Sequence, residues 1–272
     1  LSGLRKVKSI TIPDGVQKIS AETFYGCKSL KEVKLPKSLA SFDNYTSFSA
    51  CPKLSKVTLS KENKSFKMQK GLLLNKKGTK LIWAVPAKNK ITVPDSVTSI
   101  ADNALKAGKA TSVGKKVKMI GKDAIAGKKI TKVSIAKKNK SIAKQGQCVY
   151  EKKSGKLLIA IAKKNVVKIG NKVKLISEDA SLCGSRQLKK LDIGASVKTL
   201  QGAWGEFYRA GYVTTKVYFR SKNPPKLTQN NDKNYCYLPI FRDVYVPKAS
   251  LKKYKKWYKK NDALQFARIK TF

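Results

Sequence analysis

Four aspartates recur at comparable points of the chain, and their side chains are those that could support acid–base chemistry. They are Asp14, Asp95, Asp102 and Asp123. Paired carboxylates could act as general acid and base, but the chain has no histidine, which removes the commonest general base and the Ser–His and Cys–His nucleophile pairs. Each aspartate also stands where a turn is expected, and an Asp in a turn accepts backbone hydrogen bonds. We therefore expect structural aspartates and a protein with no catalytic residues.

The five cysteines show no spacing typical of a metal site. They are Cys27, Cys51, Cys148, Cys183 and Cys236. No C-x-x-C pair is present, and the lack of histidine limits zinc ligand sets further, so we expect no metal and no cofactor. Cys27, Cys51 and Cys183 occupy one position of a repeat and should form a buried column of thiols. A disulfide between Cys27 and Cys51 is the alternative. Burial between two tyrosines is expected for Cys236.

The charge of the chain is extreme and comes almost entirely from lysine. Lys and Arg together number 60 against 16 Asp and Glu, and only six of the 60 are Arg. Arginine supplies the rigid fork that reads phosphates and bases. Because arginine is scarce here, we do not expect a sequence-specific nucleic-acid binder. Lysines gather in turns, for example at Lys61, Lys64, Lys137 and Lys138. They could attract polyanions or merely keep the protein soluble, and the sequence leaves both open.

These side chains must be positioned by a repeated unit, because the chain is internally similar. The segment from Ile12 to Ile19 returns as Val93 to Ile100. Strands that end in an apolar-x-x-apolar-x-apolar pattern recur 20 to 34 residues apart. Their last apolar residues are Ile12, Leu35, Leu59, Val93, Val113, Ile135, Ile169, Ile193, Phe219 and Val246. The period predicts a solenoid of about ten repeats over residues 1–246.

Two longer steps and the end of the chain interrupt this period. Residues 66–90 and 142–166 align at one offset of 76 residues, and each reads as an inserted β-hairpin. Residues 247–272 are expected to cap the stack with a helix that starts at Ser250. Leu251, Tyr254 and Trp257 or Tyr258 would then share its apolar face.

One full repeat carries a specific motif. It reads Ile12-Pro13-x-x-Val16-x-x-Ile19-x-x-x-x-Phe24-x-x-Cys27-x-x-Leu30-x-x-Val33-x-Leu35-Pro36. This pattern resembles the BspA-type leucine-rich repeat of bacterial surface proteins. The resemblance implies an α/β repeat: a right-handed leucine-rich-repeat solenoid of short strands and turns, with inserted hairpins and a helical C-terminal cap. It also implies a secreted or cell-surface protein that lacks catalytic activity and adheres to host matrix or to other cells.

The outward strand positions between the inward apolar residues are the candidate ligand face. They are Thr11, Lys34, Thr58, Thr92, Ser112, Ser134, Lys168, Asp192, Tyr218 and Tyr245. Hydroxyls beside aromatic rings suit a glycan or a peptide backbone on a host or neighbouring cell, although Thr and Tyr are also favoured on any exposed strand. A spacer or stalk without a specific ligand is the alternative function. The sequence has no run of 18 apolar residues. We expect a monomer whose signal peptide has been removed.

Overall fold

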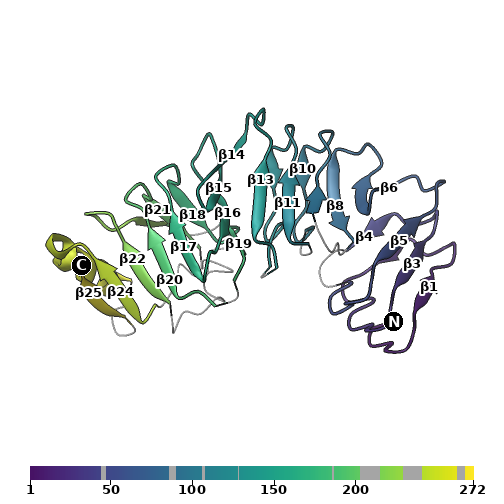
Figure 1. The fold of residues 1–272 in the computed structure, drawn as a ribbon, viewed down its shortest axis with the longest axis horizontal. Helices are drawn as coiled ribbons and strands as arrows, with labels where there is room; N and C mark the ends of the chain where they lie inside the picture. Colours follow the sequence, from purple (N-terminus) through teal and green to yellow (C-terminus); the bar gives the residue numbers. More distant parts are fainter. Residues whose placement is uncertain are drawn as a thin grey trace. The chain divides into compact units, whose positions relative to one another are not determined.

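The structure of the protein is a computed structural model that describes most of the chain. It describes residues 1–43, 47–85, 90–105, 108–127, 129–185, 187–202, 215–228, 241–261 and 267–272. Short strands and turns make up nearly all of these residues, as Figure 1 shows. The chain divides into two compact units, Leu1–Ala124 and Ile125–Phe272, which are described separately.

Parallel strands with one buried side form the first column of the N-terminal unit. The strands are β1 (Ser9–Thr11), β3 (Glu32–Leu35), β5 (Lys56–Leu59), β9 (Lys90–Thr92) and β11 (Ala110–Val113). β3 lies between β1 and β5, and β9 pairs with β11. Val33 and Leu35 are buried while Lys34 between them is exposed, because successive side chains of a strand point to opposite faces. The predicted inward and outward alternation is confirmed here.

A second column of short strands and the first hairpin complete this unit. The strands are β2 (Lys18–Ile19), β4 (Ser41–Phe42), β6 (Phe66–Gln69), β7 (Leu72–Asn75), β8 (Lys80–Ala84), β10 (Ser99–Ile100) and β12 (Met119–Ile120). β2 pairs with β4, while the other five form a sheet in the order β12-β10-β8-β7-β6. β6, β7 and β8 are antiparallel neighbours, which confirms the predicted insertion.

The C-terminal unit repeats the plan with a longer parallel sheet. Its strands are β13 (Lys132–Ile135), β14 (Ile142–Gln145), β15 (Cys148–Glu151), β16 (Leu157–Ile161), β17 (Val166–Ile169), β18 (Leu175–Ser177), β19 (Ser181–Cys183), β20 (Lys190–Ile193), β21 (Thr199–Gln201), β22 (Lys216–Phe219), β23 (Lys226–Thr228), β24 (Asp243–Val246) and β25 (Arg268–Thr271). The sheet β17-β20-β22-β24-β25 is parallel throughout. β18, β21 and β23 form the second column, and β14, β15 and β16 form the second predicted hairpin.

A buried asparagine stands just before each hairpin. Asn63 is fully buried, and its side-chain amide donates to the carbonyls of Pro36, Lys37 and Leu39 at 3.2, 3.1 and 2.8 Å. Its Oδ1 accepts from the backbone N–H of Ser65 and of Phe66. Asn139 lies 76 residues later, is 2 % exposed, and accepts from Ser141 and Ile142 in the same way. The duplication therefore includes a polar residue that the apolar pattern does not reveal.

The core of each unit consists of the inward residues of successive turns. In the N-terminal unit Phe24 and Phe48 stack with ring centroids 4.9 Å apart, and Trp83 lies 4.9 Å from Phe48. A repeat is too small to bury its own apolar face, so these contacts between turns carry the stability. Trp83 of the hairpin ends this aromatic column, and the turn that follows carries the small residue Ala104 in place of a ring.

The C-terminal segment contains the predicted helix. It also contains one strand that the sequence did not predict. A 3-10 turn η1 (Lys248–Ser250) leads into α2 (Leu251–Lys260), as expected, although the Ser250 hydroxyl makes no capping bond. Tyr254 and Tyr258 are fully buried against the core, and Tyr254 Oη donates to the carbonyl of Ser221 at 3.1 Å. β25 then extends the parallel sheet beyond β24. No described helix is long and apolar enough to cross a membrane.

Candidate recognition surface

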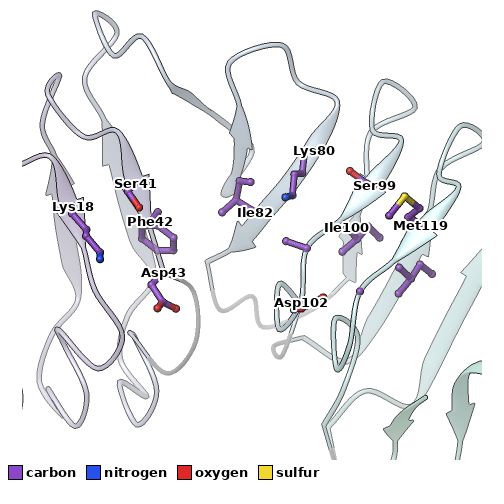
Figure 2. A pocket seen from close by; sticks show the side chains of 13 residues that line it. Lys18, Ser41, Phe42, Asp43, Lys80, Ile82, Ser99, Ile100, Asp102 and Met119 are labelled. Carbon is purple, nitrogen blue, oxygen red and sulfur yellow. The ribbon is translucent and has the colours of Figure 1, made fainter. Parts of the chain in front are cut away.

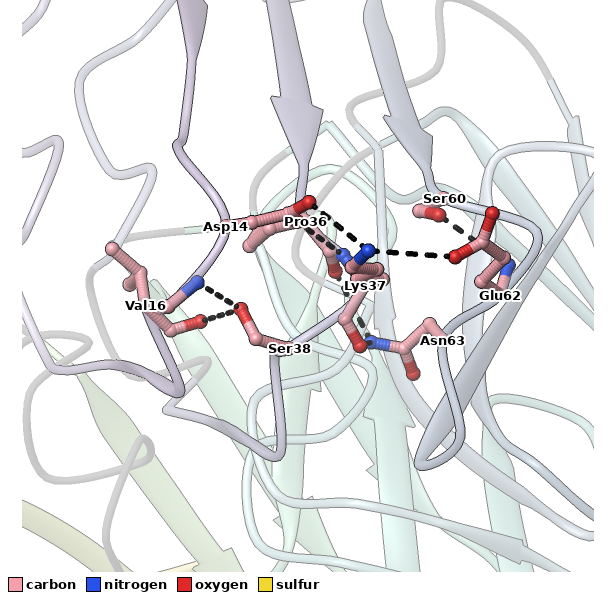
Figure 3. A network of polar contacts seen from close by, with 9 residues as sticks. Asp14, Val16, Pro36, Lys37, Ser38, Ser60, Glu62 and Asn63 are labelled. Atoms are coloured by element: carbon pink, nitrogen blue, oxygen red, sulfur yellow. Dashed lines mark hydrogen bonds and ion pairs between the residues drawn. The ribbon is translucent and has the colours of Figure 1, made fainter.

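The aspartates that could have been catalytic connect successive turns. Asp14 Oδ1 accepts from the backbone N–H of Lys37 at 3.3 Å, and Figure 3 shows the ion pair of the same two residues. Asp95 accepts from Lys115 N at 3.0 Å. The backbone N–H and the ammonium group of Lys115 hold the pKa of Asp95 below its ordinary value.

Two further aspartates lie in the corner that follows the second column of strands. Asp102 accepts from Lys122 N at 2.9 Å, one repeat further along the chain. Asp123 lies in a turn at a φ of 50°. The four carboxylates are spread over different turns, and Asp14, Asp95 and Asp102 accept hydrogen bonds from backbone amides. The expected turn role fits this geometry better than a catalytic pair does.

The cysteines of the repeat are buried thiols that bond to the preceding turn. Cys51 Sγ donates to the carbonyl of Phe24 at 2.9 Å, Cys27 Sγ to that of Leu1 at 3.2 Å, and Cys183 Sγ to that of Ile125 at 3.0 Å. Cys27 and Cys51 are buried and free, so the structure has no disulfide between them. Burial raises the pKa of Cys51 and of Cys148, which makes these thiols poor nucleophiles. Cys236 lies outside the described residues.

A groove opens beside the second column of the N-terminal unit. It has a volume of about 660 Å³. Phe42, Ile82 and Met119 line it together with Lys18, Lys80 and two carboxylates, as Figure 2 shows. Met119 is 69 % exposed. Asp102, one of the carboxylates, already binds the Lys122 amide. The described part of the chain contains no group of three His, Cys, Asp or Glu residues that could hold a metal.

The candidate ligand face separates into rows that belong to different sheets. Thr11, Lys34 and Thr58 are direct neighbours on β1, β3 and β5. Thr92 and Ser112 pair on β9 and β11, and Ser134 lies on β13. The longest row crosses the C-terminal sheet. It runs through Lys168, Asp192, Tyr218 and Tyr245 and ends at Lys270.

The two tyrosines of this row form a stacked pair. Their ring centroids are 4.5 Å apart and the rings are 8° from parallel. Neighbouring strands lie about 4.8 Å apart, so equal outward positions bring flat rings into face-to-face contact. Lys190 Nζ lies 4.0 Å from the Tyr218 centroid and Lys270 Nζ 5.7 Å from the Tyr245 centroid. The two rings therefore cover one face of each other and lie beside cations, and both side chains are half-buried.

Two carboxylates hold the arginines of this face in fixed positions. Arg220 binds Asp192 through two bonds of 2.7 Å, and Arg268 binds Asp243 through bonds of 3.0 and 2.9 Å. The pKa of Asp243 is lowered by the bond to Arg268 and by Lys270, whose Nζ lies 3.2 Å away. Both bidentate forks are thus occupied within the protein.

Several contributors to this face were not predicted from the sequence. Lys190 and Arg220 lie two residues before Asp192 and two residues after Tyr218, so the strand period of two was the signal that could have found them. Phe272 is half exposed, with Arg220 Cζ 4.5 Å from its ring. It follows β25, in the segment expected to be the helical cap, so no sequence pattern placed it on this face.

Stacked turns with inward aliphatic residues, two columns of short strands and inserted hairpins define a leucine-rich-repeat β-solenoid. The sequence pattern of the BspA type leucine rich repeat region matches residues 2–70 and 85–204, in six copies. The chain belongs to this family, as its motif predicted. No curated protein matches the chain significantly.

Solved structures of other leucine-rich repeat proteins are similar to this chain. A leucine-rich repeat protein from Eubacterium ventriosum ATCC 27560 is 15 % identical, with a TM-score of 0.47, over 89 % of this chain and 64 % of its own. A leucine rich cell surface protein from Faecalibacterium prausnitzii A2-165 is 14 % identical, with a TM-score of 0.47, over 84 % and 61 %. This chain therefore spans less than two thirds of the length of either protein.

Proposed function

We propose that this protein is a non-catalytic recognition protein that acts outside the cell and binds its partner through the outward face of the C-terminal sheet. The observation that carries the proposal is the stacked pair of Tyr218 and Tyr245 among cations on that face. The core uses the inward residues of the same strands, so the fold does not require aromatic rings outside. The partner is a protein or a glycan on a host or neighbouring cell.

The geometry suits recognition because the contact groups are fixed before binding. Stacking and cation contacts restrict the two tyrosines, and Asp192 fixes Arg220. A binding surface that is already ordered loses less side-chain entropy on association. Tyr is also one of the residue types that dominate binding energy in protein interfaces. Membership of the BspA type family supports the proposal that the protein is secreted or held at the cell surface.

The test is a binding screen of the full chain against immobilised matrix proteins and glycans at about 50 and 300 mM salt. We expect saturable binding that survives the higher salt and is lost in the double variant Tyr218→Ala/Tyr245→Ala. Tyr25→Ala is the matched control, because Tyr25 is 46 % exposed in a turn of the other unit. Absence of any saturable ligand would instead support the spacer function.

A further inference from the structure

The outward face of the sheet from β17 to β25 presents many more cations than carboxylates. Its cations are Lys168, Lys190, Lys216, Arg220, Arg268 and Lys270, and its carboxylates are Asp192 and Asp243. We infer that this face binds a linear anionic polysaccharide through its sulfate or carboxylate groups. This inference rests on the proposed function, since it names the ligand of the same surface.

The groups that point outward are suited to anions. Lys168 and Lys216 are exposed and form no ion pair with the described residues. Their ammonium groups therefore stay available as hydrogen-bond donors. The hydroxyls of Tyr218 and Tyr245 likewise have no bond to the described part of the chain. Ammonium groups only donate and hydroxyls can donate, and a sulfate or carboxylate group accepts such bonds.

The same geometry disfavours nucleic acids. Proteins that hold single strands offer aromatic faces on which bases stack. Here the faces of Tyr218 and Tyr245 are filled by each other and by Lys190 and Lys270. The arginine forks that would bind phosphate are engaged by carboxylates. A ligand must therefore bind by contacts to ring edges and lysine head groups.

The extent of the row favours a chain molecule. Lys168 and Lys270 are separated by four strand spacings, roughly 19 Å in all. Peptides are usually held at a sheet edge, in an apolar groove or in an aromatic-lined groove. The row lies on the face of the sheet and is lined by charged groups and phenol edges. A sugar chain with repeated anionic groups matches both its length and its charge.

The experiment compares variants of the full chain for binding to heparin by titration calorimetry at about 150 mM salt. Lys168→Gln/Lys216→Gln should weaken binding by about threefold to tenfold and reduce the dependence of affinity on salt. Lys137→Gln/Lys138→Gln is the matched control, with the same change of charge in an exposed turn. Its effect should stay below about twofold.

A second pair of variants tests for a gain of affinity. Asp192→Asn removes the partner of Arg220, so heparin affinity should rise about twofold to fivefold. Asp179→Asn is the control, because Asp179 pairs with Lys156 at 2.7 Å, off this sheet face. The heparin affinity of this variant should change little. If both aspartate variants strengthen binding equally, or both lysine pairs weaken it equally, the charge acts as a diffuse field and the inference is wrong.

The ligand class is tested separately from the proposed function. Polyglutamate, single-stranded DNA and neutral dextran should bind at least tenfold more weakly than heparin or alginate. Tighter binding of polyglutamate would identify an acidic protein as the partner and overturn the inference. If no anionic polysaccharide binds, the inference fails. The proposed function survives that result if the screen yields another ligand that the two tyrosine substitutions remove.

Discussion

Replacing Asn63 by alanine removes the polar link between the first hairpin and the repeat before it. The side chain is fully buried and satisfies three carbonyls and two amides of the backbone. Two N–H groups and one oxygen can form about four good bonds at once. Each contributes about 1 kcal/mol net, so Asn63→Ala should lower the free energy of unfolding by about 4 kcal/mol.

The effect should be visible in a thermal melt and located by hydrogen exchange. For a chain of this size we expect the melting temperature to fall by on the order of 10 °C. Exchange should accelerate at Ser65 and Phe66, whose amides lose their acceptor. In the C-terminal unit, Asn139→Ala should have the same local effect at Ser141 and Ile142.

The control is an asparagine of the same hairpin with less burial. Asn75 accepts from Thr79 and Lys80 at 2.8 Å each, at partly exposed positions where water can replace the bonds. Asn75→Ala should cost only about 1 kcal/mol. The reasoning would be refuted if Asn63→Ala and Asn75→Ala were equally stable, or if the Ser65 and Phe66 amides kept their protection.

Three further predictions concern the cap and the thiols. Tyr258→Phe removes a buried hydroxyl that has no hydrogen-bond partner among the described residues, and it should raise the free energy of unfolding in urea by up to about 1 kcal/mol. Tyr254→Phe loses the bond to Ser221 and should lower the free energy of unfolding by a similar amount. Equal effects of the two substitutions would contradict the assignment. Burial raises the pKa of Tyr258, so the unfolded chain ionises this group first and unfolding should become easier above about pH 10. A pH series of urea midpoints, flatter in Tyr258→Phe, checks this. Cys51 should stay unreactive toward a thiol reagent until the protein unfolds, and labelling of the native protein at the rate of a free thiol would contradict its burial beside Phe24.

The sequence predicted those parts of the fold that depend on apolar spacing. Every predicted inward anchor lies in a first-column strand or directly after one, because alternation along a strand is a local property. The hairpins followed from a single offset between two copies. The role of Asn63 was not predicted because it depends on carbonyls about 25 residues earlier, which no local pattern shows. β25 was not predicted because Ile269 is its only inward apolar residue, so its apolar pattern is weaker than that of the preceding helix.

The recognition surface was only partly predictable for a related reason. The period of the repeat placed Tyr218 and Tyr245 in one row, and the structure pairs them. The partners that fix the row come from strands 25 to 28 residues apart, as with Arg220 and Asp192 or Arg268 and Asp243. These ion pairs determine which of the many lysines have no carboxylate partner. Composition alone therefore could not separate Lys168 and Lys216 from the lysines of the turns.

Lysine footprinting of the full chain tests the central claim most directly. The protein is acetylated briefly with and without its saturating ligand, and the labelling of each lysine is measured by mass spectrometry. We predict that Lys168, Lys190, Lys216 and Lys270 are protected while Lys137 and Lys138 are labelled as before. Equal protection of the turn lysines, or protection confined to them, would contradict recognition by the face of the C-terminal sheet.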